Sequence, residues 1–179
     1  MILLKKACFL FTLFTAILFC SSCAEPVPEP DPINAPAIWE ASIDDVSFSL
    51  ETTENDSDAF IRFSEPEILK QMEVRIEDGL LHAVYDGLET EISPQFIANI
   101  YPFYQAIMTF RTSDVGGMDS GVVSGDKQFK ALRDESGNYL QIEVKGNDGT
   151  HYKYAILSVT IKHDNTTRTS QDSSGSDPA

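Results

Sequence analysis

Two cysteines separated by two serines, in the stretch CSSC that ends at Cys23, are the residues whose spacing first suggests chemistry. A CxxC pair could be a redox dithiol or half of a zinc site. It could also belong to a processing signal, because Lys5 and Lys6 precede a short apolar run that ends just before it. That run is shorter than the roughly 20 apolar residues that a membrane-spanning helix needs. The pattern therefore predicts a signal peptide over residues 1–22.

The residues around Cys23 resemble the bacterial lipobox, in which small residues precede a cysteine that becomes acylated. Serines occupy positions 21 and 22, whereas Cys20 follows the bulky Phe19 and stands where lipoboxes usually carry an aliphatic residue. The resemblance implies cleavage before Cys23 and lipidation of Cys23, which would anchor the protein to a membrane without spanning it. The alternatives are an ordinary signal peptide with cleavage nearby and an uncleaved anchor. With Cys8 and Cys20 removed, we expect no thiol chemistry, no disulfide and no cofactor.

The histidines and the Gly-rich segment form no recognisable catalytic or metal-binding motif. His82, His151 and His163 lack the spacing of metal ligands, and no cysteine remains to assist them. The Gly-rich residues 112–126 follow a helical pattern, whereas a phosphate-binding loop precedes its helix. We therefore expect neither a metal site nor a phosphate-binding loop.

Carboxylates are too abundant in this chain to mark a site by themselves. Asp114, Asp119 and Asp126 share one loop, and residues 54–58 read ENDSD, so either segment could bind calcium weakly. Neither fits the spacing of an EF-hand. Paired carboxylates could also hydrolyse glycosides, and an envelope hydrolase using carboxylates is the alternative function. Because the acidic residues concentrate at expected strand ends and turns, we expect no catalytic residue and a protein that is not an enzyme.

Charge and composition bound the partners and the domain boundaries. The formal net charge of −15 opposes binding to nucleic acid. Residues 23–36 combine the lipidated cysteine with a Pro-rich linker, which should be extended. Residues 37–163 suffice for a single β-rich domain with its own core, and the polar residues 164–179 are typical of a disordered tail.

Apolar residues alternate with period two through most of residues 37–163, which predicts antiparallel strands. The alternation slips at Asp44–Asp45, where a bulge or bend is expected. Asp78–Gly79 and Asp86–Gly87 are hairpin turn signals. The expected fold class is α+β, mainly β, with a curved antiparallel sheet covered by a central helix or helix pair.

A helical pattern interrupts the strands after Ser93, a good helix cap, and Pro94, which suits the first helical position. Pro102 should kink this helix or split it in two. Its aromatic and aliphatic side chains could simply pack onto the sheet, or they could cover an apolar cavity that holds an acyl chain or another lipid. The candidate pocket residues are Phe96, Ile100, Tyr104 and Met108.

Residues 63–92, FSEPEILKQMEVRIEDGLLHAVYDGLETEI, resemble a pattern in small lipoproteins of spore-forming Gram-positive bacteria, which include GerS-like germination lipoproteins. In them a Pro-Glu-x-Leu turn follows a strand, and a hairpin closed by Asp-Gly leads to Tyr-x-Gly-Leu. The matching residues are Pro66, Glu67, Leu69, Asp78, Gly79, Tyr85, Gly87 and Leu88. The resemblance implies the LolA/LolB fold, an incomplete antiparallel β-barrel with helices as a lid over its concave face. These are turn residues, so the resemblance assigns no site residue.

Within the LolA/LolB group, the carrier is soluble and the receptor is lipidated. This chain resembles the receptor in having a lipobox. No counterpart of the receptor's exposed hydrophobic loop is recognisable in it. We expect a lipid-anchored extracytoplasmic binding or scaffolding lipoprotein of the cell envelope. Acylated Cys23 would attach it to the cell membrane, or to the outer membrane if the source has two membranes. Its partner would be an envelope protein or a hydrophobic molecule such as a lipid.

Overall fold

The computed structural model describes residues 30–55, 58–113 and 121–162. The chain divides into two compact units, Met1–Pro30 and Asp31–Ala179, and all described helices and strands belong to the second. The predicted signal peptide, the lipidated Cys23 and the predicted tail 164–179 lie outside the described residues, as do Asp114, Asp119 and His163.

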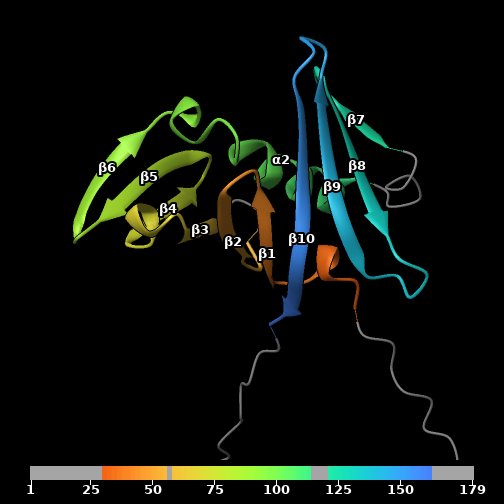
Figure 1. The fold of residues 1–179 in the computed structure, drawn as a ribbon, viewed down its shortest axis with the longest axis horizontal. Coiled ribbons are helices and arrows are strands. Elements are labelled where there is room, and N and C mark those ends of the chain that lie inside the picture. The colour runs from red at the N-terminus through yellow and green to blue at the C-terminus, as the bar shows by residue number, and fades with distance from the viewer. Residues whose placement is uncertain (1–29, 56–57, 114–120, 163–179) are drawn as a thin grey trace, which may run out of the picture. The chain divides into compact units, whose positions relative to one another are not determined.

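One ten-stranded antiparallel sheet forms the framework of the second unit (Figure 1). Its strands lie in the order β6-β5-β4-β3-β2-β1-β10-β9-β8-β7, so two meanders are joined where β1 pairs with β10. The strands are β1 (Ala37–Ile43), β2 (Val46–Thr52), β3 (Ala59–Glu65), β4 (Met72–Glu77), β5 (Leu80–Tyr85), β6 (Leu88–Ile92), β7 (Val122–Ser124), β8 (Lys127–Arg133), β9 (Tyr139–Gly146) and β10 (His151–Ile161). The sheet is open, with β6 and β7 at its edges, and the mainly β, antiparallel fold class is confirmed.

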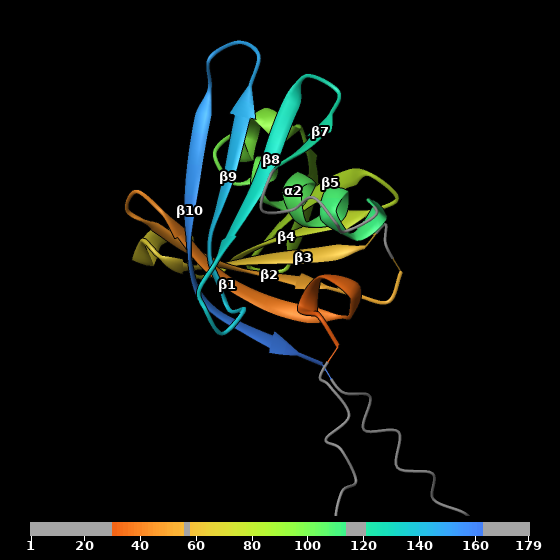
Figure 2. The same cartoon turned by 90° about the vertical axis from the view of Figure 1, so that its right-hand side faces the viewer.

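The sheet bends around the α-helix α2 (Tyr101–Thr112), which connects the two meanders. Figure 2 shows β8, β9 and β10 running across the direction of β1, β2 and β3, with α2 on the concave side between the two groups. The helix packs against β7, β8 and β9 and against the short 3-10 helix η1 (Pro32–Asn34). The concave face of the sheet is therefore the buried face over the area that α2 covers.

Pro102 divides the helical segment instead of kinking a single helix. A 3-10 helix, η3 (Pro94–Ile97), follows Ser93, and α2 begins at Tyr101 with Pro102 in its first turn. In the first turn a proline loses no helical hydrogen bond, because the first backbone N–H groups have no partner in the helix. Of the two expectations for Pro102, the structure shows the split.

The hairpin turns form where the sequence predicts them. Asp78 and Asp86 have φ angles of 50°, and the glycines that follow them have φ angles of 82° and 76°. Positive φ at both central residues is the requirement of a tight type I′ hairpin, which Asp-Gly satisfies at low cost. The phase slip at Asp44–Asp45 is likewise a chain reversal between β1 and β2, with Asp44 at a φ of 51°, and not a bulge within one strand.

The compact unit begins at Asp31, before the expected boundary at Ala37. Ile33, in η1, is fully buried and belongs to the core, so the end of the Pro-rich segment is part of the folded unit. The chain leaves the same end of the sheet, because the amide of Lys162 donates to the carbonyl of Pro36 at 2.9 Å. The buried hydroxyl of Thr52 contacts both backbone polar groups of Ala37, at 3.1 and 3.3 Å, and fixes the start of β1.

Candidate functional site

The concave face of the sheet and the inner face of α2 form one continuous apolar core. Phe103, Ala106, Ile107 and Phe110, spaced at three and four residues along α2, are all fully buried. The Phe103 ring packs edge-on against Phe48 of β2, with ring centroids 5.3 Å apart. Side chains therefore fill the space between this face of α2 and the sheet.

Tyr154 of β10 fixes the start of α2 against the sheet. Its ring is fully buried and lies 5.1 Å from the ring of Phe103, centroid to centroid. Its hydroxyl donates to the backbone carbonyl of Asn99 at 2.8 Å. Burial raises the pKa of Tyr154 far above its ordinary value, so the hydroxyl stays protonated and remains a donor.

The four predicted pocket residues do not share one environment. Ile100 is 2% exposed and lies in the core, and Tyr104 is half-buried and packs against the core. Met108 is partly exposed, and Phe96 is 62% exposed. The periodicity changes at Tyr101, where the turn around η3 gives way to α2, so a single helical phase drawn through Phe96 does not continue along α2.

A polar cluster formed by Asp31, Arg133 and Tyr139, named the Asp31 cluster, joins the start of the unit to β8 and β9. The Asp31 carboxylate accepts from the Tyr139 hydroxyl at 2.8 Å and from the Arg133 guanidinium at 3.0 Å. It also caps η1 by accepting from the Ile33 amide at 3.1 Å. The Arg133 guanidinium lies 4.2 Å from the Tyr139 ring centroid, and that ring packs edge-on against Trp39 at 5.0 Å.

The electrostatics of the Asp31 cluster favour the ionised carboxylate. Burial alone would raise the pKa of Asp31. The hydrogen bonds from Ile33 and Tyr139 and the positive charge of Arg133 outweigh burial, so the pKa lies below its ordinary value. This cluster holds the start of the folded unit against β8 and β9, and its ionised carboxylate is a poor proton donor.

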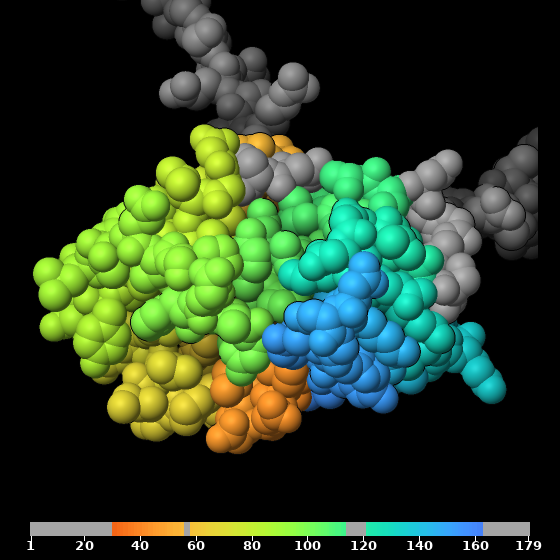
Figure 3. Space-filling model, turned by 90° about the horizontal axis from the view of Figure 1, so that it is seen from above, coloured from red at the N-terminus to blue at the C-terminus, as the bar shows by residue number. Residues whose placement is uncertain are grey.

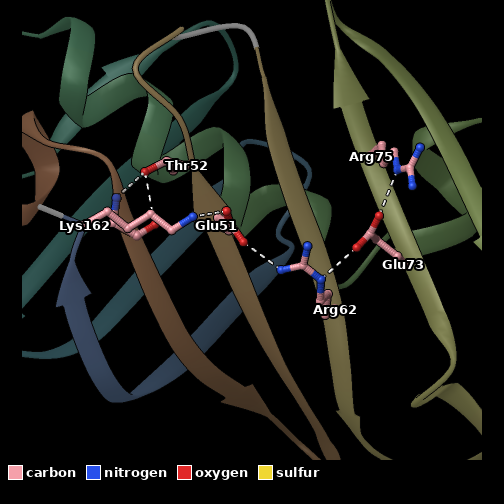
Figure 4. A network of polar contacts seen from close by, with 7 residues as sticks. Glu51, Thr52, Arg62, Glu73, Arg75 and Lys162 are labelled. Atoms are coloured by element: carbon pink, nitrogen blue, oxygen red, sulfur yellow. Dashed lines mark hydrogen bonds and ion pairs between the residues drawn. The ribbon is translucent and has the colours of Figure 1, made fainter. Parts of the chain in front are cut away.

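A row of alternating charges, named the ion-pair row, crosses the convex face of the sheet (Figure 4). Glu51 of β2 pairs with Lys162 and, at 2.7 Å, with Arg62 of β3. Arg62 also pairs with Glu73 of β4 at 2.7 Å, and Glu73 pairs with Arg75 at 2.8 Å. Each carboxylate thus lies between two cations. Strands β2 and β3 contribute one member each, and β4 contributes two.

Both carboxylates of the ion-pair row are held in the ionised form. Partial burial would raise the pKa of Glu51 and of Glu73. Hydrogen bonds from Lys162 and Arg62 to Glu51, and from Arg75 and Arg62 to Glu73, outweigh it, so both pKa values are lowered. Lowered values are the opposite of what a general acid requires.

A shallow polar hollow lies on β8 and β9, on the side of the sheet away from α2. Its lining residues are Gln128, Lys130, Glu143 and Lys145. Glu143 pairs with Lys153 of β10 at 3.4 Å, and the His151 ring nitrogen lies 3.8 Å from it. Burial would raise the pKa of Glu143, but the charges of Lys153 and Lys145 lower it overall. No sequence motif or resemblance predicts this hollow.

The described residues hold no cluster of three or more His, Cys, Asp or Glu side chains suited to a metal ion. His82 lies 3.4 Å from a carboxylate oxygen of Glu89 on the convex face, and His151 lies beside Glu143 on another part of the sheet. The two histidines thus lie beside different carboxylates. None of the described helices has the length and hydropathy needed to cross a membrane.

Exposed apolar side chains concentrate in the segment that contains η2 (Glu67–Leu69), β4, β5, β6 and η3, residues 67–97, named the wing. The exposed large apolar residues of the wing are Ile68, Leu80, Tyr85, Leu88 and Phe96, with exposures from 50% to 80%. Figure 3 shows the wing at the end of the face opposite to β7, β8 and β9. The sequence pattern predicts these strands, but it does not reveal this exposure, because Tyr85 and Leu88 follow the same alternation as buried residues.

Comparisons with known proteins give no match to this chain, either among protein-family models or among curated proteins.

Proposed function

We propose that this protein is a lipid-anchored extracytoplasmic binding or scaffolding protein of the cell envelope, and that its domain acts through its surface. One observation favours binding at the protein surface over binding in an internal cavity. The side chains of α2 that face the sheet, from Phe103 to Phe110, are fully buried in a shared core. A side chain that already fills the interior leaves no volume for an acyl chain at that place.

The finer part of the fold proposal is an incomplete barrel of the LolA/LolB type. It is supported by one open antiparallel sheet that bends around a helix on its concave face. In this proposal α2 has become a core element instead of a lid, because Phe103 and Phe110 pack where a carrier would hold its cargo.

The proposed anchor is acylated Cys23, in the lipobox-like stretch of the sequence. The positions of the two ends of the described chain support the proposal of a tether. The unit starts at Asp31 and the described chain ends at Lys162, which bonds to Pro36, so both connections leave from one end of the β1–β10 pair. A domain held at one end presents its other surfaces to partners.

A non-enzymatic role is part of the proposal. Four carboxyls are partly buried and have lowered pKa values, because cationic side chains or hydrogen-bond donors stabilise their ionised form. They are Asp31, Glu51, Glu73 and Glu143. Glycoside hydrolysis needs one carboxyl with a raised pKa to protonate the leaving group. The shifted carboxyls of the described chain move in the other direction.

The anchoring part of the proposal is tested with Cys23→Ala and a matched Cys20→Leu control in metabolic palmitate labelling and membrane fractionation. Cys23→Ala should abolish labelling and release the protein or leave it unprocessed. Cys20→Leu should keep both labelling and membrane association, because it restores the aliphatic residue usual in a lipobox. Equal labelling of the two variants would refute the anchor.

The surface-binding part is tested by native mass spectrometry and by titration with an apolar fluorescent probe, using the full chain extracted from membranes. We expect no lipid bound to the protein beyond its covalent acyl groups, and no probe enhancement. A stoichiometric co-purifying lipid that is lost on substitution of Ile100 would overturn the filled-core proposal and favour lipid binding.

A further inference from the structure

The wing ends in a strand edge that is open for pairing. β6 pairs with β5 along one side, and no strand of the described chain lies along its other side. An edge strand presents backbone N–H and C=O groups that can extend the ladder to a segment from another molecule. The other edge of the sheet, β7, contains three residues and offers a shorter ladder.

An apolar row on the concave face reaches this edge without being covered. Tyr85 lies opposite Met72 on one side and opposite Leu88 on the other, so the three side chains form one row across β4, β5 and β6. Met72 is partly buried, Tyr85 is 50% exposed and Leu88 is 76% exposed. Exposure therefore rises toward the edge, and an apolar side chain on an added strand would cover Leu88 and extend the row.

The convex face of the same edge is acidic. Along β6, Glu89 and Glu91 alternate with Leu88 and Thr90 of the concave face, and both glutamates are exposed. Glu89 is 3.9 Å from Arg75 and 3.4 Å from His82. The side chains of alternating charge that cross the convex face therefore end at the edge strand with the negative charge of Glu89. The neighbour that continues this alternation is positive.

A second copy of this chain does not fit the edge. Pairing two β6 strands would bring the carboxylates of Glu89 and Glu91 from both copies together, and like charges on adjacent strands are destabilising. The chain as a whole carries a formal net charge of −15, which adds to the repulsion between copies. Charge thus selects a different and basic partner.

We propose that β6 binds an extended segment of a second envelope protein, in which apolar residues alternate with lysine or arginine. The apolar residues would lie beside Leu88 and Thr90 on the concave face, and the basic residues would lie beside Glu89 and Glu91 on the convex face. This inference rests on the proposed function as a surface-binding module and names its surface and the chemistry of its partner. Acidic side chains on edge strands commonly prevent unwanted pairing, and here the same charges also determine which segment can pair.

The test is a competition between synthetic peptides of about eight residues, the length of a long edge strand. One peptide alternates valine and lysine, a second alternates valine and glutamate, and a third has the composition of the first with its lysines in one block. Binding to the full chain in detergent is measured by fluorescence anisotropy, and amide hydrogen exchange identifies the strand that becomes protected. The test variant is Glu89→Lys with Glu91→Lys. The matched control is Glu54→Lys with Glu135→Lys, which makes the same charge change at two exposed positions outside the wing.

The alternating lysine peptide should bind at least about tenfold more tightly than the blocked one and should protect β6 amides. The Glu89/Glu91 variant should lose about tenfold in affinity for it and gain affinity for the glutamate peptide, while the control changes by less than about twofold. Equal losses in both variants, or equal binding of the alternating and blocked peptides, would show that only net charge is involved and would overturn the assignment. Absence of binding by the unsubstituted chain would also overturn it.

Failure of this inference is distinguishable from failure of the proposed function. The Glu89/Glu91 variant could keep its palmitate label and crosslink to the same envelope proteins as the unsubstituted chain. In that case the binding surface lies elsewhere, and the function as an anchored binding protein stands. If Cys23→Ala leaves labelling intact, or if a stoichiometric lipid occupies the core, the proposed function itself fails.

Discussion

The Tyr139 hydroxyl donates to the Asp31 carboxylate at 2.8 Å across 108 positions of sequence. This bond, with the one from Arg133, joins the first residue of the folded unit to the last meander. Asp31, which lies within the Pro-rich segment, thus has a structural role, because it holds the start of the folded unit against β8 and β9. Ile33, two residues after Asp31, and Trp39, whose ring packs against Tyr139, are both fully buried, so the cluster also closes one end of the core.

Asp31→Asn should therefore lower the free energy of unfolding at neutral pH by about 1–3 kcal/mol, the range for a hydrogen-bonded charged group. Asparagine keeps an acceptor for the cap of η1, so the loss reports the charge and not the cap. The measurement is urea unfolding at pH 7. Lys70→Gln, which removes an exposed ion pair with Glu67, is the control and should leave stability unchanged.

The same cluster should make the free energy of unfolding sensitive to acid. The folded pKa of Asp31 is lowered, so its stabilisation is fully present above the ordinary carboxyl pKa of about 3.9 and is lost as the pH falls through the folded value. Unfolding curves at pH 6, 4 and 3 should show the unsubstituted chain losing more stability than Asp31→Asn, with the two converging at the lowest pH. Parallel losses in both proteins would contradict the assignment of this acid sensitivity to Asp31.

The inner face of α2 should be far more sensitive to truncation than the residues that flank it. Phe103→Ala should cost about 3–5 kcal/mol, because it removes a fully buried ring from contact with Phe48 and Tyr154. Phe96→Ala, at a 62% exposed position, should change stability by less than about 0.5 kcal/mol. Thermal unfolding followed by circular dichroism compares the two. A similar cost at Phe96 would show that it packs against something in solution.

Local signals predicted the parts of this fold that depend on local geometry. Asp78–Gly79 and Asp86–Gly87 form the expected turns because their positive φ angles are a requirement of the turn itself. Pro102 divides the helical segment because a proline is restricted at the backbone wherever it stands. The alternation of apolar and polar residues predicted most strands because successive side chains of a strand point to opposite faces, which is also a local property.

Features set by distant contacts were not visible in the sequence. The Asp31 cluster depends on β8 and β9 returning beside the start of the unit, and no local pattern encodes that meeting. The apolar row that ends at Leu88 appears only once the register of β4, β5 and β6 is known. The exposed Phe96 fits a helical stripe in the sequence only if one period spans residues 94–112, whereas the structure has a 3-10 turn followed by an α-helix with a different phase.

The ion-pair row should contribute little to stability despite its length. Its central member Arg62 has a side chain that is 49% exposed, and exposed ion pairs typically contribute about 0.2–1 kcal/mol. Arg62→Gln should therefore lower the free energy of unfolding by less than about 1 kcal/mol, and the difference should shrink in 1 M salt, where charges are screened within about 3 Å. A loss above about 2 kcal/mol that persists in salt would show that the row acts cooperatively.

Tyr154 should make the domain sensitive to alkali. Its pKa is raised by burial, so its contribution is fully present below the ordinary tyrosine value of about 10 and is lost as the pH rises past it, when the unfolded chain ionises first. Tyr154→Phe removes the bond to the Asn99 carbonyl and should cost about 0.5–1.5 kcal/mol at pH 7. Between pH 9 and 11 its stability should fall less steeply than that of the unsubstituted chain. Tyr85→Phe, at a half-exposed position of the wing, is the matched control and should retain the steeper fall. An alkaline slope unchanged by Tyr154→Phe would mean that this ring is accessible to solvent and that α2 does not seal the core over it.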